Sequence, residues 1–135
     1  MLEDRPVAYI LDDDASVRRA LSRLLDRNGM SSIEFASAQE FLHEELPHRP
    51  ACIILDVWMP GLNGLELQAE LTAKNIQLPI IFITGRGDIP MTIEAMRAGA
   101  IDFLPKPLDD EAILGAVARG IKRDRACACG ETGKK

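Results

Sequence analysis

The chain has 135 residues and a net charge of −5, and its length is that of one domain. Hydrophobic residues make up 47% and charged residues 27%, which is the composition of a globular protein and excludes a disordered chain. The negative charge disfavours direct binding of nucleic acid by this chain. The sequence shows no secretory leader and no apolar run near the roughly 20 residues that span a bilayer, so we expect a cytoplasmic protein without membrane contact.

Short apolar runs along the chain predict strands. Four of them lack alternation, as expected of strands covered on both faces: Val7–Leu11, Cys52–Leu55, Ile80–Ile83 and Ile101–Leu104. A fifth run, Ser32–Phe35, alternates and predicts an edge strand.

Segments with helical periodicity lie between these runs. The first expected helix carries the apolar stripe Val17–Leu25 and stops at Asn28-Gly29. The second and third begin at the N-caps Ser37 and Asn63. The fourth runs from Pro90 to Ala98-Gly99, and the fifth carries the apolar stripe Ile113–Ile121. Strands alternating with helices predict an α/β fold, with a doubly wound five-stranded parallel sheet between two helical layers. We expect the domain to cover residues 1–123, and residues 124–135 to form a flexible tail or linker.

The cysteines and histidines give weaker signals. Cys52 lies in an apolar run and is predicted to be a core residue. Cys127 and Cys129 lie in the tail without a third ligand nearby, so they indicate structural zinc only weakly. His43 and His48 are predicted to be surface residues.

Polar side chains gather where the predicted strands end. Asp12 and Asp13 follow the first strand, Asp56 the third, Thr84 the fourth and Lys106 the fifth. In a parallel sheet these ends share one edge, which is where ligands bind. Carboxylates packed together need a positive partner, which Lys106 and Mg²⁺ would provide. Phosphoryl transfer uses a carboxylate, a metal and a lysine, so Asp56 is the predicted nucleophile. Each residue alone fits turn or capping chemistry equally well.

Several motifs in order resemble the receiver domain of two-component response regulators, from about Pro6 to Arg123. The resemblance is carried by Leu11-Asp12-Asp13, Ile54–Gly64, Ile81–Gly85, Ala98–Ala100 and Phe103–Pro107. It implies a flavodoxin-like fold and two-component phosphorelay signalling, with Asp56 accepting a phosphoryl group from a sensor histidine kinase. The resemblance also implies a signalling domain that catalyses its own phosphorylation and dephosphorylation, and no separate enzyme activity.

The resemblance further implies roles for the residues around Asp56. Asp13, the Asp56 carboxylate and the backbone carbonyl of Trp58 would hold Mg²⁺, and Asp12 would assist through water. This metal set is an expectation from the family, because the residues alone indicate only an acidic cluster.

Three residues would form the switch by the same resemblance. Lys106 would bind a phosphoryl oxygen, the Thr84 hydroxyl would move toward the phosphate, and Phe103 would rotate inward. Spacing alone favours an ordinary sheet residue at Phe103. The readout face would comprise the fourth helix, fifth strand and fifth helix, through which the domain would regulate an output or form a homodimer.

The segment at positions 88–91 resembles the branch of receivers that often carry helix-turn-helix outputs. No such output follows in this sequence, so we expect a single-domain regulator, an excised receiver or part of a hybrid kinase.

Two alternatives remain. Asp12-Asp13-Asp14 also resembles the Asp-x-Asp nucleophile motif of haloacid-dehalogenase-type phosphohydrolases, with Asp12 attacking and Asp14 as acid/base, although Asp56 then has no role. Asp14 is also a plausible helix N-cap. The second alternative is a receiver that acts only as a binding module.

Overall fold

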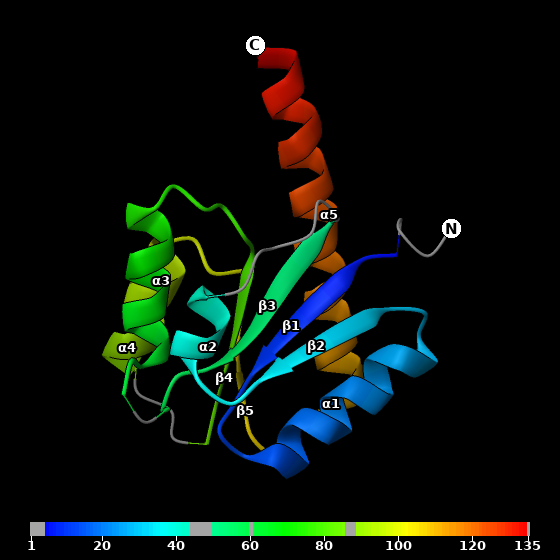
Figure 1. The fold of residues 1–135 in the computed structure, drawn as a ribbon, viewed down its shortest axis with the longest axis vertical. Helices are drawn as coiled ribbons and strands as arrows, with labels where there is room; N and C mark the ends of the chain where they lie inside the picture. The colour runs from blue at the N-terminus through cyan, green and yellow to red at the C-terminus, as the bar shows by residue number, and fades with distance from the viewer. Residues whose placement is uncertain (1–4, 44–49, 60, 86–88, 135) are drawn as a thin grey trace.

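The computed structural model describes residues 5–43, 50–59, 61–85 and 89–134. Five parallel strands form one sheet in the order β2-β1-β3-β4-β5, with helices on both faces (Figure 1). The strands are β1 (Val7–Leu11), β2 (Ser31–Phe35), β3 (Ala51–Asp56), β4 (Ile80–Thr84) and β5 (Asp102–Pro105). The helices are α1 (Ala15–Arg27), α2 (Ala38–Leu42), α3 (Gly64–Ala73), α4 (Ile89–Arg97) and α5 (Asp110–Lys134). The predicted fold class is confirmed.

Burial along the strands explains their sequence patterns. Every residue of β1, β3 and β4 is buried, because these strands lie inside the sheet and helices cover both of its faces. The edge strand β2 exposes Ile33 and Glu34, in agreement with its predicted position.

Two apolar layers hold the helices to the sheet. On one face α1 and α5 pack against alternate strand residues such as Ala8, Cys52 and Ile81. On the other face α2, α3 and α4 pack against Tyr9 and Phe82. Cys52 is a core residue as predicted, and its burial raises the pKa of its thiol to about 12, so this thiol is unreactive.

The predicted helix caps are present. Asn63 and Glu66 form a capping box at the start of α3, in which each side chain bonds the other residue's backbone N–H. The Ser37 hydroxyl accepts a hydrogen bond from the backbone N–H of Glu40. After α4 the chain turns at Gly99, whose φ of +106° is a conformation that glycine adopts without strain.

Helix α5 continues through the segment where a flexible tail is expected. Its ribbon runs to Lys134 and projects beyond the sheet (Figure 1). The segment lacks proline, which would interrupt the backbone hydrogen bonds of the helix. The boundary at residue 123 stays a prediction.

No helix in the described parts of the chain is long and apolar enough to cross a membrane. His43 is exposed as predicted, and His48 lies outside the described residues.

Gly64 is expected to tolerate no side chain. A Cβ atom there would lie 3.0 Å from the Asp56 carbonyl oxygen and from Val57 Cα, and 3.1 Å from the Phe82 ring. We predict that Gly64→Ala lowers the free energy of unfolding by about 1–3 kcal/mol through overpacking. Gly115→Ala in α5 is the control, because its Cβ would meet only the flexible end of Arg119 at 3.9 Å. The control should gain up to about 1 kcal/mol. Urea unfolding followed by circular dichroism measures both changes, and equal effects would contradict the prediction.

Candidate functional site

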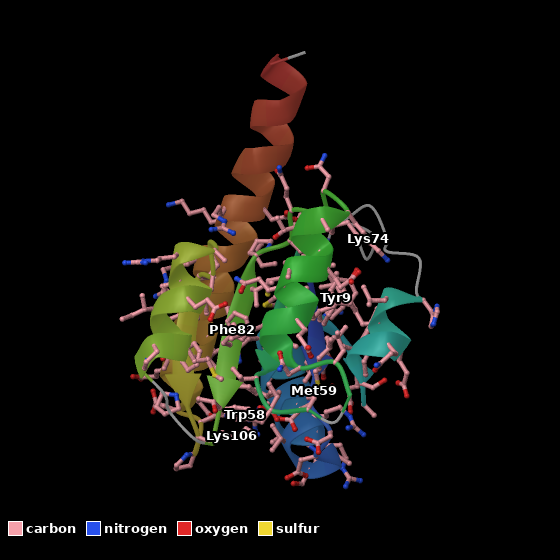
Figure 2. The ribbon with its side chains drawn as sticks, turned by 90° about the vertical axis from the view of Figure 1, so that its left-hand side faces the viewer. Tyr9, Trp58, Met59, Lys74, Phe82 and Lys106 are labelled. Carbon is pink, nitrogen blue, oxygen red and sulfur yellow. The ribbon has the colours of Figure 1, made fainter. Side chains whose placement is uncertain are left out.

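An acidic cluster lies at the carboxyl edge of the sheet. Carboxylate oxygens of Asp12, Asp13 and Asp56 all lie within 4.8 Å of one another. Asp12 and Asp56 are buried, whereas Asp13 is exposed. Trp58 and Lys106 lie close together at this end of the molecule (Figure 2). The predicted convergence of strand ends on one edge is therefore present.

Lys106 reaches two of these carboxylates. Its Nζ atom lies 3.0 Å from Asp12 Oδ2 and 3.5 Å from Asp56 Oδ2. Its backbone N–H donates to the Thr84 carbonyl at 2.8 Å, which fixes the chain after β5 against the end of β4. Burial alone would lower the pKa of Lys106, but the hydrogen bond and charge of Asp12, and the charge of Asp56, outweigh it and raise the pKa. The ammonium group therefore stays charged.

The surroundings of Asp56 disfavour its charged form, and Lys106 offsets only part of this effect. Burial first, and the charge of Asp12 second, raise its pKa from the ordinary 3.8 to about 6. Lys106 and the backbone N–H of Trp58, which donates to Asp56 Oδ1 at 3.2 Å, counteract part of that shift. At neutral pH the carboxylate is mostly ionised, but the ionised form is destabilised.

Backbone hydrogen bonds hold the loops around the cluster. The N–H of Asp14 donates to Asp12 Oδ1 at 2.9 Å, and Arg18 Nη1 donates to the Asp12 carbonyl at 2.6 Å. Next to Asp56, the Val57 N–H donates to the Ile83 carbonyl at 3.1 Å. The sequence gives no sign of this contact, because an arginine on a predicted helix need not bind the preceding loop.

Asp14 serves as the N-cap of α1. Its Oδ1 atom accepts from the backbone N–H of Ser16 at 2.9 Å and from the Ser16 hydroxyl at 2.7 Å. These bonds lower the pKa of Asp14. A proton donor needs the opposite shift. The capping prediction is confirmed, and the geometry argues against Asp14 as the acid of a phosphohydrolase.

Thr84 and Phe103 lie on the strands next to the acidic cluster. Thr84 ends β4, is 1% exposed and pairs in register with Pro105. Phe103 pairs with Phe82, and their ring centroids are 5.7 Å apart. Phe103 is partly buried against the core formed with α2, α3 and α4. The structure thus brings Asp12, Asp13, Asp56, Trp58 and Lys106 together, with Thr84 and Phe103 on the adjoining strands.

The donor atoms of the cluster fit a hard divalent cation. They are carboxylate oxygens, with no nitrogen or sulfur donor in the cluster, and Mg²⁺ prefers such ligands. Burial and then the charge of Asp12 raise the pKa of Asp56, and a bound cation would favour the ionised carboxylate.

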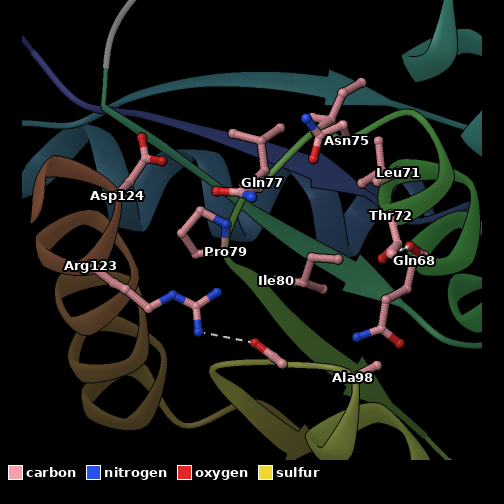
Figure 3. A pocket seen from close by; sticks show the side chains of 13 residues that line it. Gln68, Leu71, Thr72, Asn75, Gln77, Pro79, Ile80, Ala98, Arg123 and Asp124 are labelled. Carbon is pink, nitrogen blue, oxygen red and sulfur yellow. Dashed lines mark hydrogen bonds between the residues drawn. The ribbon is translucent and has the colours of Figure 1, made fainter. Parts of the chain in front are cut away.

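A separate cleft lies at the opposite edge of the sheet (Figure 3). It has a cavity volume of about 270 Å³ and lies between the end of α3, the start of β4 and α5. Arg123 Nη1 donates to the Gly99 carbonyl at 3.0 Å across one side. Asp124 is the one carboxylate among the described residues that line it, so it does not resemble the acidic cluster.

Comparison with known proteins identifies relatives of this chain. Residues 8–118 match the family model described as response regulator receiver domain. The chain is 47% identical to nodulation protein W of Bradyrhizobium diazoefficiens, over 90% of this chain and 53% of that protein. It is 45% identical to the transcriptional regulatory protein FixJ of Azorhizobium caulinodans, over 91% of this chain and 58% of that protein. The chain therefore spans about half the length of these curated relatives.

Solved structures agree with this result. The response regulator StyR aligns with a TM-score of 0.90 and 42% identity, covering 96% of this chain and 66% of StyR. The structure titled FixJ-N aligns with a TM-score of 0.78 and 38% identity, covering 88% of this chain and 94% of that one.

The pKa of Asp56 predicts how stability depends on pH. The folded state binds the Asp56 proton more tightly than the unfolded state, because the folded pKa is raised. The stabilisation from this proton is fully present below pH 3.8 and is lost as pH rises through about 6. Without divalent cations, Asp56→Asn should therefore raise the free energy of unfolding at pH 8 by about 1–3 kcal/mol. This gain should shrink toward pH 5. Urea unfolding in EDTA at both pH values measures it.

The control is Asp26→Asn, which removes one negative charge from an exposed position on α1. Its effect should stay within about 0.5 kcal/mol at both pH values. An Asp56→Asn effect that is the same at pH 5 and pH 8 would contradict the assigned pKa shift.

Proposed function

The chain belongs to the response regulator receiver domain family, and on that premise we propose that Asp56 accepts a phosphoryl group from a sensor histidine kinase. The observation that carries the proposal is the buried Asp56 carboxylate, which lies beside Lys106 and within the acidic cluster. The domain then acts in two-component phosphorelay signalling, with phosphorylation as its input.

The chemistry needs little more than positioning and charge compensation. A carboxylate oxygen of Asp56 forms a bond to phosphorus, while the bond between phosphorus and the donor's imidazole nitrogen breaks and leaves its electron pair on that nitrogen. The ammonium of Lys106, now 3.5 Å from Asp56, binds a phosphoryl oxygen. Asp56 must be ionised to attack, so its pKa of about 6 leaves it competent at neutral pH.

Asp13 and Asp56, the Trp58 carbonyl, and Asp12 through water are the proposed Mg²⁺ ligands. Bound Mg²⁺ would supply positive charge against the oxygens of the transferred group. The close approach of Asp12, Asp13 and Asp56 supports this set.

Phosphorylation would be read through Thr84, Lys106 and Phe103. The phosphoryl group adds charge and acceptor oxygens, so a conformation in which Thr84 and Lys106 bind it gains population. Thr84 lies at the end of β4 and its carbonyl already binds the backbone of Lys106, which supports their coupling. Phe103 would rotate inward when Thr84 moves. These steps link Asp56 to β5 and the helices beside it.

The output would be controlled through the face formed by α4, β5 and α5. Ile93 and Met96 of α4 expose 47% and 42% of their surface, and Asp102 of β5 pairs with Arg119 of α5. Exposed apolar groups on α4 suit a protein interface, which supports an output partner or a homodimer at this face.

We further propose that the domain spans residues 1–123 and works in the cytoplasm. It catalyses only its own phosphorylation and dephosphorylation. The phosphohydrolase alternative assigns no role to Asp56 and requires acid chemistry from Asp14, whose hydrogen bonds to Ser16 oppose it.

Acetyl phosphate with Mg²⁺ tests the acceptor. Intact mass spectrometry should show the mass of one labile phosphoryl group on the native chain and none on Asp56→Asn. Asp12→Asn should still be labelled, because the bond to phosphorus forms on Asp56. Turnover of phosphate monoesters that requires Asp12 would contradict the proposal, and no labelling in any variant would indicate a binding module.

Titration with Mg²⁺ alone tests the metal site. The chain has a single tryptophan, Trp58, whose backbone N–H binds Asp56, so its fluorescence should respond to the metal. Asp13→Asn should raise the apparent Kd about tenfold or more, because it removes a charged ligand. Asp14→Asn is the matched control and should bind as the native chain does, since asparagine also caps helices. Equal loss in both variants would contradict the assigned ligand set.

A further inference from the structure

The outer flank of α1 and the edge strand β2 enclose a shallow groove with a cavity volume of about 440 Å³. Figure 1 shows β2 as the outermost strand on this side, with α1 alongside it. Arg5, Arg19 and Arg23 line the groove. The hydroxyls of Ser22 and Ser32 meet within it, 2.7 Å apart. A protein with a net charge of −5 thus has a groove in which arginines outnumber acidic side chains by three to two.

The guanidinium groups of Arg19 and Arg23 are available to a partner. Both are exposed on α1 and four positions apart, so they lie on one side of the helix. Neither makes an ion pair or hydrogen bond with any residue that the structure describes, whereas Arg18 pairs with Glu34 at 3.3 Å. Like charges at this spacing destabilise a helix slightly. An anionic occupant would remove that repulsion.

The rest of the lining shows which anion fits. Asp26 and Glu34 also line the groove, and they would repel a continuous chain of phosphates. A protein segment can place separate carboxylates against Arg19 and Arg23 and avoid these two groups. Among the described strands only β1 pairs with β2, so the outer edge of β2 can hydrogen-bond to an extended backbone.

We propose that this groove docks an extended, acidic segment of a partner protein. The contact lies on the outer flank of α1 and β2, whereas the proposed phosphorylation site lies at the carboxyl edge of the sheet. It needs no phosphoryl group on Asp56, so Asp56→Asn should bind the segment as the native chain does. The two proposals can therefore fail separately.

A fluorescein-labelled peptide in which glutamate alternates with serine is the probe, because alternate residues of an extended segment place their carboxylates apart on one side. Fluorescence anisotropy at low salt should give saturable binding that weakens as salt is added, because exposed charges are screened. Amide NMR signals that shift on binding should lie in α1 and β2. The double variant Arg19→Gln/Arg23→Gln should raise the Kd about fivefold or more. Both side chains are exposed, so the variant should keep the native circular dichroism spectrum.

Lys74→Gln/Arg97→Gln is the matched control. It removes the same charge from exposed positions at the ends of α3 and α4, on the other face of the sheet from α1. Figure 2 shows Lys74 at the end of α3 away from Trp58 and Lys106. This control should bind the probe with nearly native affinity.

Four results would overturn the proposal. Absence of saturable binding would remove it, and equal weakening in both double variants would indicate attraction to overall charge. Tighter binding of an oligothymidylate than of the peptide would assign the groove to nucleic acid. Salt-sensitive self-association that Arg19→Gln/Arg23→Gln abolishes would make a second copy of the chain the occupant.

Discussion

The burial of Asp56 beside Asp12 is the constraint on which the site depends. Burial first, and the charge of Asp12 second, disfavour the ionised form of Asp56 and raise its pKa to about 6. Lys106 bonds both groups, although it lies 94 residues from Asp12 and 50 from Asp56 in the sequence. Lys106 therefore offsets part of the negative charge only when β1, β3 and β5 are all in place. This partial compensation depends on the complete sheet.

The surrounding structure holds these carboxylates in an unfavourable place. Burying charge costs free energy that packing elsewhere must offset, and the two apolar layers supply that packing. Gly64 allows α3 to begin directly against the Asp56–Val57 backbone, and its N–H bonds the Val57 carbonyl at 2.9 Å. The loop after β1 is held by the Arg18 side chain, which donates to the Asp12 carbonyl. The negative charge that Lys106 leaves unbalanced suits a cation, which would in turn attract the oxygens of a phosphoryl group.

Sequence patterns predicted the sheet because strands covered on both faces must be continuously apolar, as in β1, β3 and β4. They also predicted the shared edge, since parallel strands end together. They could not predict contacts that depend on three-dimensional distance, such as Arg18 with the Asp12 carbonyl or Arg119 with Asp102. The sequence pattern also gives no sign that α5 runs to Lys134, because residues 124–134 carry no apolar periodicity.

Helix α1 lies between the acidic cluster and a groove in which arginines outnumber acidic residues. It begins next to the acidic cluster, where its N-cap Asp14 and Arg18 hold the loop of Asp12, and its outer flank carries Arg19 and Arg23. A partner with an acidic segment is repelled by the cluster and attracted to the flank, so this pattern favours one orientation of approach. Complementary charge of this kind mainly affects association rate and specificity. The charges of α1 would therefore select how a partner lies on the domain, while Asp56 and Lys106 govern the chemistry.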